Sequence, residues 1–360
     1  MDLLVKQNVI KKQKIIIDIG CKYIKILGVN YEKGKITINS STKIDATQFF
    51  FEGELSNIKD FVRSVYGTLN RRKMLKNSEI SLSIPSYMVT HKIVRIKNVN
   101  LKDLDKYIKK ECMAWNKVNM LTHNIDWSYL GSREVNGETI RYCMVAAINK
   151  AYITPIMIEF EKKSLIITTV SFGIYNLVSF ANLYSNDYEN LNKVLIDFGA
   201  QSTKLVVECE GVAIYSREIS IGFNTFVDEL FRRFSSIGIP EIIDMLTQME
   251  RKRENFLAGI HDKTAFFEVV DNLIESFQNE IIRTIQMCEE DGISISKIVC
   301  CSSILDGMLD AFVENGITVD NFDISELKTV NGSNYLLTLG DAELDATFNS
   351  AIGLSVSTLL

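Results

Sequence analysis

The chain contains one short pattern twice, half a chain length apart. Residues 14–29 read KIIIDIGCKYIKILGV, and residues 193–208 read KVLIDFGAQSTKLVVE. Aligned without a gap, both give a lysine, three apolar residues, an aspartate, one apolar residue and a glycine, and a second lysine follows five positions after the glycine. The two aspartates, Asp18 and Asp197, lie 179 positions apart (197 − 18) in a chain of 360 residues. The repetition predicts a molecule with two similar halves.

Each copy of the pattern is typical of a strand, a tight loop and a second strand. The apolar runs 15–17 and 194–196 are short and rich in branched residues, as buried strands are. A new apolar run begins near Ile24 in the first copy and at Leu205 in the second, so no helix fits between the strands. This arrangement excludes a dinucleotide-binding fold, in which the glycine-rich turn leads into a helix.

The residues of the loop suit a phosphate group. A glycine-containing hairpin loop can present consecutive backbone N–H groups to an anion. An aspartate at the strand end can hold Mg²⁺ through water, because magnesium prefers oxygen ligands and keeps part of its hydration shell. For one copy alone, ordinary turn chemistry would be the simpler interpretation. Two copies in register at half-chain spacing instead favour two hairpins that face each other across a Mg-triphosphate.

Composition excludes several classes of protein. A chain of 360 residues with 46% hydrophobic residues can bury a sizeable core, and its length suggests two domains. A net charge of −5 gives no global reason to expect nucleic acid binding. The seven cysteines contain no CxxC pair and the three histidines are far apart, so neither a disulfide framework nor a metal site is expected from them. The absence of a signal peptide pattern or a span-length apolar run predicts a cytoplasmic protein.

The two hairpins resemble the phosphate loops of the actin, hexokinase and Hsp70 ATPase superfamily. Within it, the chain is similar to the PilM family, the FtsA-like actin homologues of type IV pilus assembly. The stretches that carry this resemblance follow in the expected order from Lys14 to Ser357: ISLSIPSYMVTHKIVRIKNV, LKDLDKYIKKECMAW, YCMVAAINKAYITPIMIEFEKKSL, SREISIGFNTFVDELFRRF, EIIRTIQMCEEDG, KIVCCSSILDGMLDAF and FNSAIGLSVS.

The resemblance implies an α/β, actin-like fold, of the duplicated ribonuclease H-like ATPase type, with two similar halves and an FtsA/PilM-type inserted subdomain. The expected division is an N-terminal tail at 1–13, the first part of domain I (1A) at 14–79, an inserted 1C-like subdomain at 80–150, a return to domain I at 151–190, domain II (2A and 2B) at 191–345, and a C-terminal helix at 346–360 that packs back on domain I.

The residues of the insert support a small α/β unit. Ile80, Leu82 and Ile84 alternate with two serines, which predicts a half-buried strand. The stretch 101–115 has one apolar face at helical spacing, and residues 140–145 are strand-like. Trp115, near the helix end, is either an interface anchor or part of the core.

The resemblance also implies a site for ATP or ADP with Mg²⁺. The first loop departs from the family, because Cys21, Lys22 and Tyr23 stand where small hydroxyl residues are usual, although Lys25 holds the position of a phosphate-binding lysine. Two serines replace the Gly-Gly of the adenosine segment, and Phe223 replaces the glycine after Gly222. Asp18 and Asp197 are the expected Mg²⁺ residues, acting through water. The candidate nucleotide-binding residues are Asp18, Gly20, Cys21, Lys22, Lys25, Asp197, Gly199, Gln201, Ser202, Thr203, Gly222, Glu280, Arg283, Ser302 and Ser303.

We expect hydrolysis to be weak or absent. Attack on the γ-phosphate needs a group that orients water within hydrogen-bond reach, and the sequence places no Gln, Glu or His in that role. The catalytic residues are therefore unassigned.

The implied function is that of PilM: binding the cytoplasmic N-terminal tail of a PilN-like membrane protein, in a groove that the inserted subdomain helps to form, and linking it to cytoplasmic motor ATPases. The protein would lie at the inner face of the cytoplasmic membrane, attached only through its partner. Two alternatives remain. An FtsA-like division protein usually ends in an amphipathic membrane helix, whereas FNSAIGLSVSTLL has no basic face. A small-molecule kinase of the superfamily would need a catalytic carboxylate in a polar substrate loop, and no convincing one is found.

Overall fold

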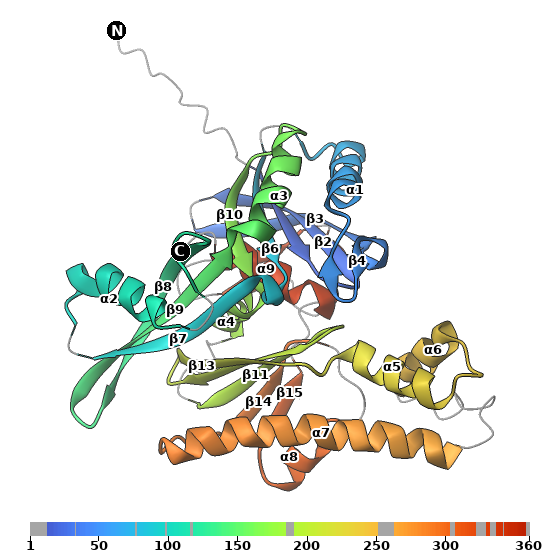
Figure 1. Ribbon diagram of the computed structural model, residues 1–360. Coiled ribbons are helices and arrows are strands. Elements are labelled where there is room, and N and C mark those ends of the chain that lie inside the picture. The colour runs from blue at the N-terminus through green and yellow to red at the C-terminus, as the bar shows by residue number, and fades with distance from the viewer. Residues whose placement is uncertain are drawn as a thin grey trace.

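The computed structural model describes residues 13–32, 34–75, 78–97, 99–115, 118–184, 191–250, 263–302, 307–321, 329–331, 336–340 and 342–357. Within these residues the chain forms two lobes, each built on one sheet, and a smaller subdomain attached to the first lobe (Figure 1). In the described part of the chain, none of the helices combines the length and the apolar character needed to cross a membrane.

The first lobe is built on a seven-stranded mixed sheet. Four helices accompany it; α1 packs against α3, and α4 packs against α9 on the side that faces the second lobe (Figure 1). The sheet order is β10 (Ile167–Phe172), β6 (Ser78–Ile84), β1 (Gln13–Ile19), β2 (Tyr23–Glu32), β3 (Lys35–Asp45), β17 (Leu336–Leu339) and β16 (Thr329–Asn331). The helices are α1 (Ile58–Arg71), α3 (Lys150–Glu161), α4 (Gly173–Tyr184) and α9 (Asn349–Ser357), and a short hairpin joins β4 (Phe50–Phe51) to β5 (Glu54–Leu55).

Strand β6 differs from the half-buried strand that its alternating serines predict. Ser81 and Ser83 are 0% and 1% exposed, and Ile80 and Leu82 are also buried. The reason is that β6 lies between β10 and β1, parallel to both, with covered faces on both sides. It therefore belongs to the sheet of the first lobe and not to the inserted subdomain.

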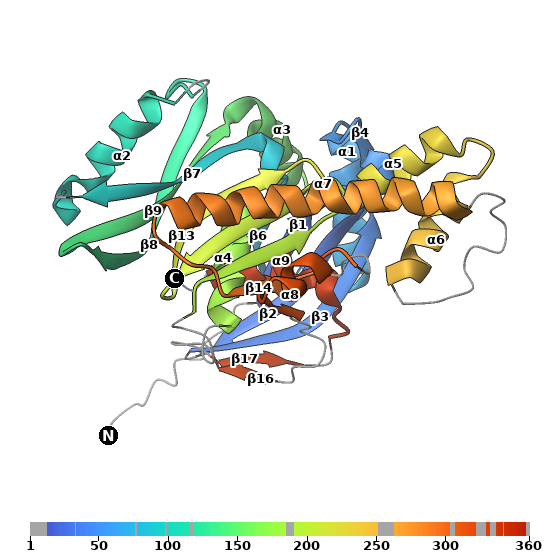
Figure 2. The same cartoon turned by 90° about the horizontal axis from the view of Figure 1, so that it is seen from below.

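The second lobe repeats the core of the first. Strands β11 and β12 form an antiparallel hairpin with β14 parallel to β11, just as β1 and β2 form a hairpin with β6 parallel to β1. The long helix α7 crosses one face of this sheet (Figure 2). The sheet order is β13 (Val212–Ile219), β12 (Thr203–Cys209), β11 (Lys193–Phe198), β14 (Lys297–Cys300) and β15 (Thr318–Asn321), and the helices are α5 (Phe223–Arg233), α6 (Ile239–Glu250), α7 (Lys263–Glu290) and α8 (Asp310–Glu314).

The inserted subdomain is a three-stranded antiparallel sheet covered by one helix. Its order is β7 (Val89–Lys97), β9 (Glu138–Asn149) and β8 (His123–Val135), and α2 (Leu104–Met113) lies on it. As the apolar spacing predicts, α2 buries Leu104, Ile108 and Cys112, and the partly buried Trp115 packs against the same core. Trp115 thus contributes to packing, one of the two interpretations left open by the sequence.

The chain returns to the first sheet earlier than the boundary at 345 would place it. Strand β17 pairs in parallel with β3, and its Leu337 is buried in the core of the first lobe. A short strand can add to the edge of a distant sheet because pairing satisfies the exposed N–H and C=O groups of that edge. Helix α9 then packs against α4, β1 and β2.

Candidate functional site

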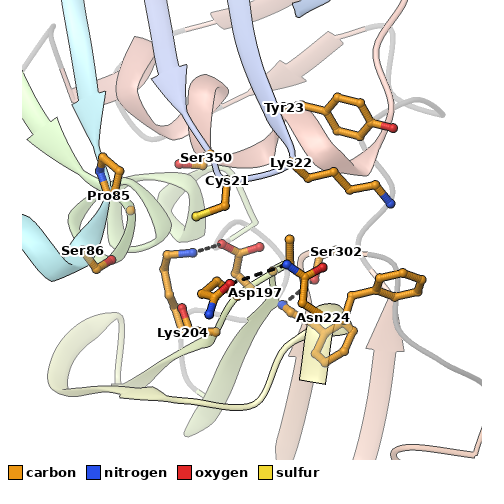
Figure 3. Close-up of a pocket in the computed structure, with 18 of the residues that line it drawn as sticks. Cys21, Lys22, Tyr23, Pro85, Ser86, Asp197, Lys204, Asn224, Ser302 and Ser350 are labelled. Atoms are coloured by element: carbon orange, nitrogen blue, oxygen red, sulfur yellow. Dashed lines mark hydrogen bonds and ion pairs between the residues drawn. The ribbon is translucent and has the colours of Figure 1, made fainter. Parts of the chain in front are cut away.

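A cleft of about 680 Å³ opens between the two lobes, and both repeated hairpins line it (Figure 3). The first lobe contributes the loop after β1, the segment after β6 and the start of α4. The second contributes the loop after β11 and the start of α5. The repeat seen in the sequence therefore places its two copies on opposite walls of one cavity.

The two loops have matching backbone geometry. The amide of Gly20 donates to the carbonyl of Tyr23 at 3.1 Å, and the amide of Gly199 donates to that of Ser202 at 3.0 Å. A Cβ on either glycine would come within 2.9 or 2.8 Å of the same carbonyl oxygen. Glycine is required at both positions because the chain turns too tightly for a side chain.

Each hairpin carries an ion pair between its aspartate and its second lysine. Asp18 lies opposite Lys25 in the strand register, with Nζ to Oδ2 at 2.8 Å, and Asp197 lies opposite Lys204, with the equivalent distance at 3.0 Å. Burial alone would raise the pKa of Asp18, but Lys25, a hydrogen bond from Ser83 and the charge of Lys204 together bring that pKa below its ordinary value. Asp18 is therefore held ionised beside an ammonium group.

A buried network of polar side chains in the first lobe holds Asp18 in place. Ser350 at the start of α9 donates to Asp18 at 3.2 Å. The side chain of Asn176 on α4, which is fully buried, donates to Ser83 at 2.8 Å and to Ser350 at 3.3 Å, and accepts from Ser171 at 2.6 Å. These bonds fix the loop of the first hairpin to the two helices that face the second lobe.

Side chains also meet across the cleft. Lys22 of the first loop places its Nζ 4.7 Å from the ring centroid of Phe223, the first residue of α5, which is cation–π distance. A Cβ added to Gly53, in the turn between β4 and β5, would lie 3.5 Å from the amide of Gln201 in the second loop. The lobes are thus in contact at Lys22 of the first loop, where the sequence departs from the family pattern, and at Gln201 of the second loop.

The comparisons with known proteins agree with this arrangement. A family model described as "Type IV pilus assembly protein PilM" matches residues 16–299, which is more than half of the chain. The chain belongs to the PilM family. Its fold is actin-like, as predicted from the sequence. No curated protein matches the chain.

The chain is also similar to solved structures. A chain of the "PilM-PilN type IV pilus biogenesis complex" is 12% identical, with a TM-score of 0.76 over 97% of this chain and 99% of that one. MreB 5 of Spiroplasma citri bound to AMPPNP is 12% identical, with a TM-score of 0.48 over 86% of this chain and 91% of that one.

Most of the residues expected to bind nucleotide in this PilM-family chain line the cleft. They are Asp18, Gly20, Cys21, Lys22, Lys25, Asp197, Gly199, Gln201, Ser202 and Ser302. Two more, Thr203 and Gly222, adjoin the lining residues without lining the cleft themselves. Thr203 is fully buried and donates to the carbonyl of Ile221 at 2.6 Å. Gly222 is the N-cap of α5. Ser302 accepts from the amide of Phe198 at 2.6 Å, which fastens the end of β11.

Two candidate residues of the adenosine side lie elsewhere. Among the described residues that line the cleft, Glu280 and Arg283 are absent. Both are on α7, where Glu280 pairs with Arg217 and with Arg283, and the Arg283 side chain is 66% exposed. Ser303 lies outside the described residues. The structure therefore brings together the phosphate side of the expected PilM site and not these adenosine-side charges.

The cleft also contains residues that were not singled out from the sequence. Glu218 on β13 lies opposite Lys204 in the strand register and accepts a hydrogen bond from Ser202. Gly173 begins α4 at the point where Lys204 passes it. Glu218 and Ser350 lie inside the quoted motifs SREISIGF and FNSAIGLSVS, so proximity to the motif glycines was an available signal. Gly173 had no comparable signal.

The donors in the cleft suit a phosphate group better than a metal ion. Three lysines and two glycine loops face the cavity. Among the described residues, however, no group of three metal-binding side chains comes together. Asp18 and Asp197, the residues expected to hold Mg²⁺ through water, each have a lysine ammonium as their neighbour.

Proposed function

We propose that the protein is an actin-fold adaptor that binds the cytoplasmic N-terminal tail of a PilN-like membrane protein and links it to cytoplasmic motor components of a type IV pilus machine. The observation that carries this proposal is the similarity to a chain of the PilM-PilN complex, which extends over 97% of the chain. The protein would then lie at the cytoplasmic face of the membrane, held there by its partner.

A groove on the first lobe offers a place for such a tail. It has a volume of about 780 Å³ and lies between the N-terminal end of α1 and one side of α3. Helix α3 follows directly on β9 of the inserted subdomain, so the groove borders that subdomain. Its lining combines apolar side chains with two lysines: Ser56, Asn57, Ile58, Lys59, Lys150, Ala151, Thr154, Pro155, Ile158 and Glu159. Ile158 is 44% exposed, as expected of a side chain that a ligand can cover.

Nucleotide in the cleft between the lobes would modulate this binding. ATP or ADP held by the two glycine loops would favour one relative orientation of the lobes over others, and so shift the population of the tail-binding form. The loops and the lysines of the cleft support this part of the proposal. Hydrolysis is not required, because differential affinity for two conformations is sufficient to shift an equilibrium.

A binding assay tests the adaptor role. A fluorescently labelled peptide with the sequence of the PilN-like tail is titrated with the purified full chain, and anisotropy reports the complex. Saturable binding of this peptide and not of a scrambled one is expected. Ile158→Glu should weaken binding at least about tenfold, because it places a charge where apolar area is buried (about 1.4 kcal/mol).

A matched variant separates a specific loss from a general one. Ile166 is exposed to 72%, does not line the groove and follows α3 in the chain. Ile166→Glu should therefore leave the dissociation constant unchanged. Equal affinity for the tail and the scrambled peptide, or the same loss in both variants, would count against the proposal.

A further inference from the structure

Lys204 has an unusual position at the centre of the cleft. In the sheet of the second lobe, the strand register places Asp197 directly opposite it on β11 and Glu218 directly opposite it on β13. Its Nζ lies 3.0 Å from the carboxylate of Asp197. An ammonium group thus stands in the middle of a row of three, with a carboxylate on either side.

The same side chain reaches the first lobe. A Cβ on Gly173, the first residue of α4, would collide with Cε of Lys204. The glycine therefore leaves the space through which the lysine passes beneath α4. Because the N-terminal end of a helix carries partial positive charge, a cation here is unfavourable unless nearby carboxylates compensate for it.

The charges around Lys204 do compensate. Burial would lower the pKa of Lys204, but Asp197, Glu218 and Asp18 of the opposite hairpin raise it above the ordinary value. Conversely, the charge of Lys204 helps Lys25 and Ser83 to lower the pKa of Asp18 against the effect of burial, which raises it. The ammonium group is therefore kept charged between Asp197 and Glu218 of the second lobe, and its charge also acts on Asp18 of the first.

We propose that Lys204 is the resident cation of the cleft: its ammonium group occupies the place between the two hairpins where a divalent ion would be needed, so that the lobes are joined without metal. Asp18 and Asp197 then neutralise lysines and do not hold Mg²⁺. This inference concerns the same cleft as the proposed nucleotide site, but it does not depend on nucleotide being bound.

Removal of the lysine should create a need for metal. In Lys204→Ser, the carboxylates of Asp197 and Glu218 lose the cation that lies between them, and Mg²⁺, which prefers carboxylate oxygen and keeps water as its other ligands, can enter in its place. The purified full chain is melted in EDTA and in millimolar MgCl₂. Wild type should melt at the same temperature in both. Lys204→Ser should melt lower in EDTA and recover by about 2 °C or more in MgCl₂.

Two further variants make the result specific. Lys97→Ser removes the lysine of an exposed ion pair with Glu138 and should show no response to Mg²⁺. Lys204→Ser combined with Asp197→Asn leaves less uncompensated charge, and so should fold even where the single variant does not, with a smaller Mg²⁺ response than the single variant.

Three results would overturn the inference. They are a rise in the melting temperature of wild type with Mg²⁺, a folded Lys204→Ser protein whose melting temperature does not change with Mg²⁺, and an equal Mg²⁺ response in Lys97→Ser. A parallel titration with ATP in EDTA and in MgCl₂ reports on the nucleotide separately. Absence of any ATP response would contradict nucleotide binding, while the metal comparison, which contains no nucleotide, still tests the role of Lys204.

Discussion

Lys193 and Glu208 form a buried ion pair in the second hairpin. They lie at its open end, away from the loop that lines the cleft. Their charged groups are 2.7 Å apart, and the side chains are 0% and 4% exposed. They lie directly opposite each other in the strand register of β11 and β12. Taking two charges out of water is costly, so the pair stabilises the fold only while both partners are present.

Lys193→Met should therefore destabilise the protein strongly. It leaves the carboxylate of Glu208 buried without a partner, which costs about 3–5 kcal/mol in the free energy of unfolding. The double variant Lys193→Met, Glu208→Leu should recover most of this loss, because an apolar pair can replace a buried ion pair. Urea unfolding of the three proteins measures both effects. A double variant as unstable as the single one would show that packing, and not the unpaired charge, determines the loss of stability at this position.

His91 on β7 gives the protein a pH-dependent term in its stability. Burial lowers the pKa of His91 below its ordinary value of 6.5, and the charge of Glu218 offsets only part of this effect. The folded state then binds fewer protons than the unfolded state. The contribution of His91 is complete above pH 6.5 and is lost as the pH falls below that value toward the lower pKa of the folded protein.

His91→Gln should consequently flatten the pH dependence of stability below pH 6.5, the ordinary histidine value. Urea unfolding at several pH values from neutral to mildly acidic, for wild type and variant, gives the two slopes. Wild type is expected to lose more free energy of unfolding than the variant on acidification. Parallel curves would show that protonation of His91 is not linked to folding.

At the level of elements, α4 and α9 cross at very close range. Gly353 on α9 lies against the backbone of Asn176 on α4, where a Cβ would collide with the carbonyl oxygen. All residues of α9 from Asn349 to Val356 for which burial is given, except Ser350, are buried. Both helices hold residues of the polar network behind Asp18, so their separation sets the position of the first loop.

Gly353→Ala should separate the two helices and lower the free energy of unfolding by about 1–3 kcal/mol, as overpacking of a core does. Gly67→Ala is a suitable comparison, because Gly67 is in the interior of α1 and a Cβ there meets only Arg71 at an ordinary 3.7 Å. That variant should gain up to about 1 kcal/mol from helix propensity. Thermal or urea unfolding measures both, and similar values for the two variants would contradict the close-packing argument.

The elements near the repeat could be predicted from the sequence for a physical reason. A tight loop needs glycine, a strand end carries the aspartate, and branched apolar residues form the buried strand, so Gly20 and Gly199 each fix their local structure. The burial of strand β6 on both faces could not be predicted in this way. Serine is small enough to be buried in a central strand, so Ser81 and Ser83 imitate the polar face of a half-buried one.

On the scale of the whole molecule, the contacts between the lobes had no signal in the sequence. The pattern predicts two facing hairpins, but it does not show that Lys22 reaches Phe223 or that Lys204 passes Gly173. Such contacts depend on the relative placement of two lobes that are separated by more than 150 residues of chain. For the same reason, Glu280 and Arg283 could be placed on a helix, but not relative to the cleft.

The contact between Lys22 and Phe223 should hold the cleft closed. A cation–π contact contributes about 0.5–2 kcal/mol, more when the cation is shielded from water. Phe223→Ala removes the ring while leaving both phosphate loops intact, so the balance between closed and open forms should shift toward open by about 2–30-fold. Amide hydrogen exchange in residues 20–25 and 199–204 should accelerate accordingly, because opening exposes both loops to solvent.

Phe231→Ala provides the matched comparison for this variant. Phe231 is also on α5, is 39% exposed and does not line the cleft, so its removal deletes a ring of the same size from the same helix. Exchange in the two loops should be unchanged in Phe231→Ala. If both variants accelerate exchange equally, loosening of α5 is responsible. If neither variant accelerates exchange, the contact between Lys22 and Phe223 does not hold the cleft closed, and other contacts between the lobes, such as that of Lys204 with the start of α4, are sufficient.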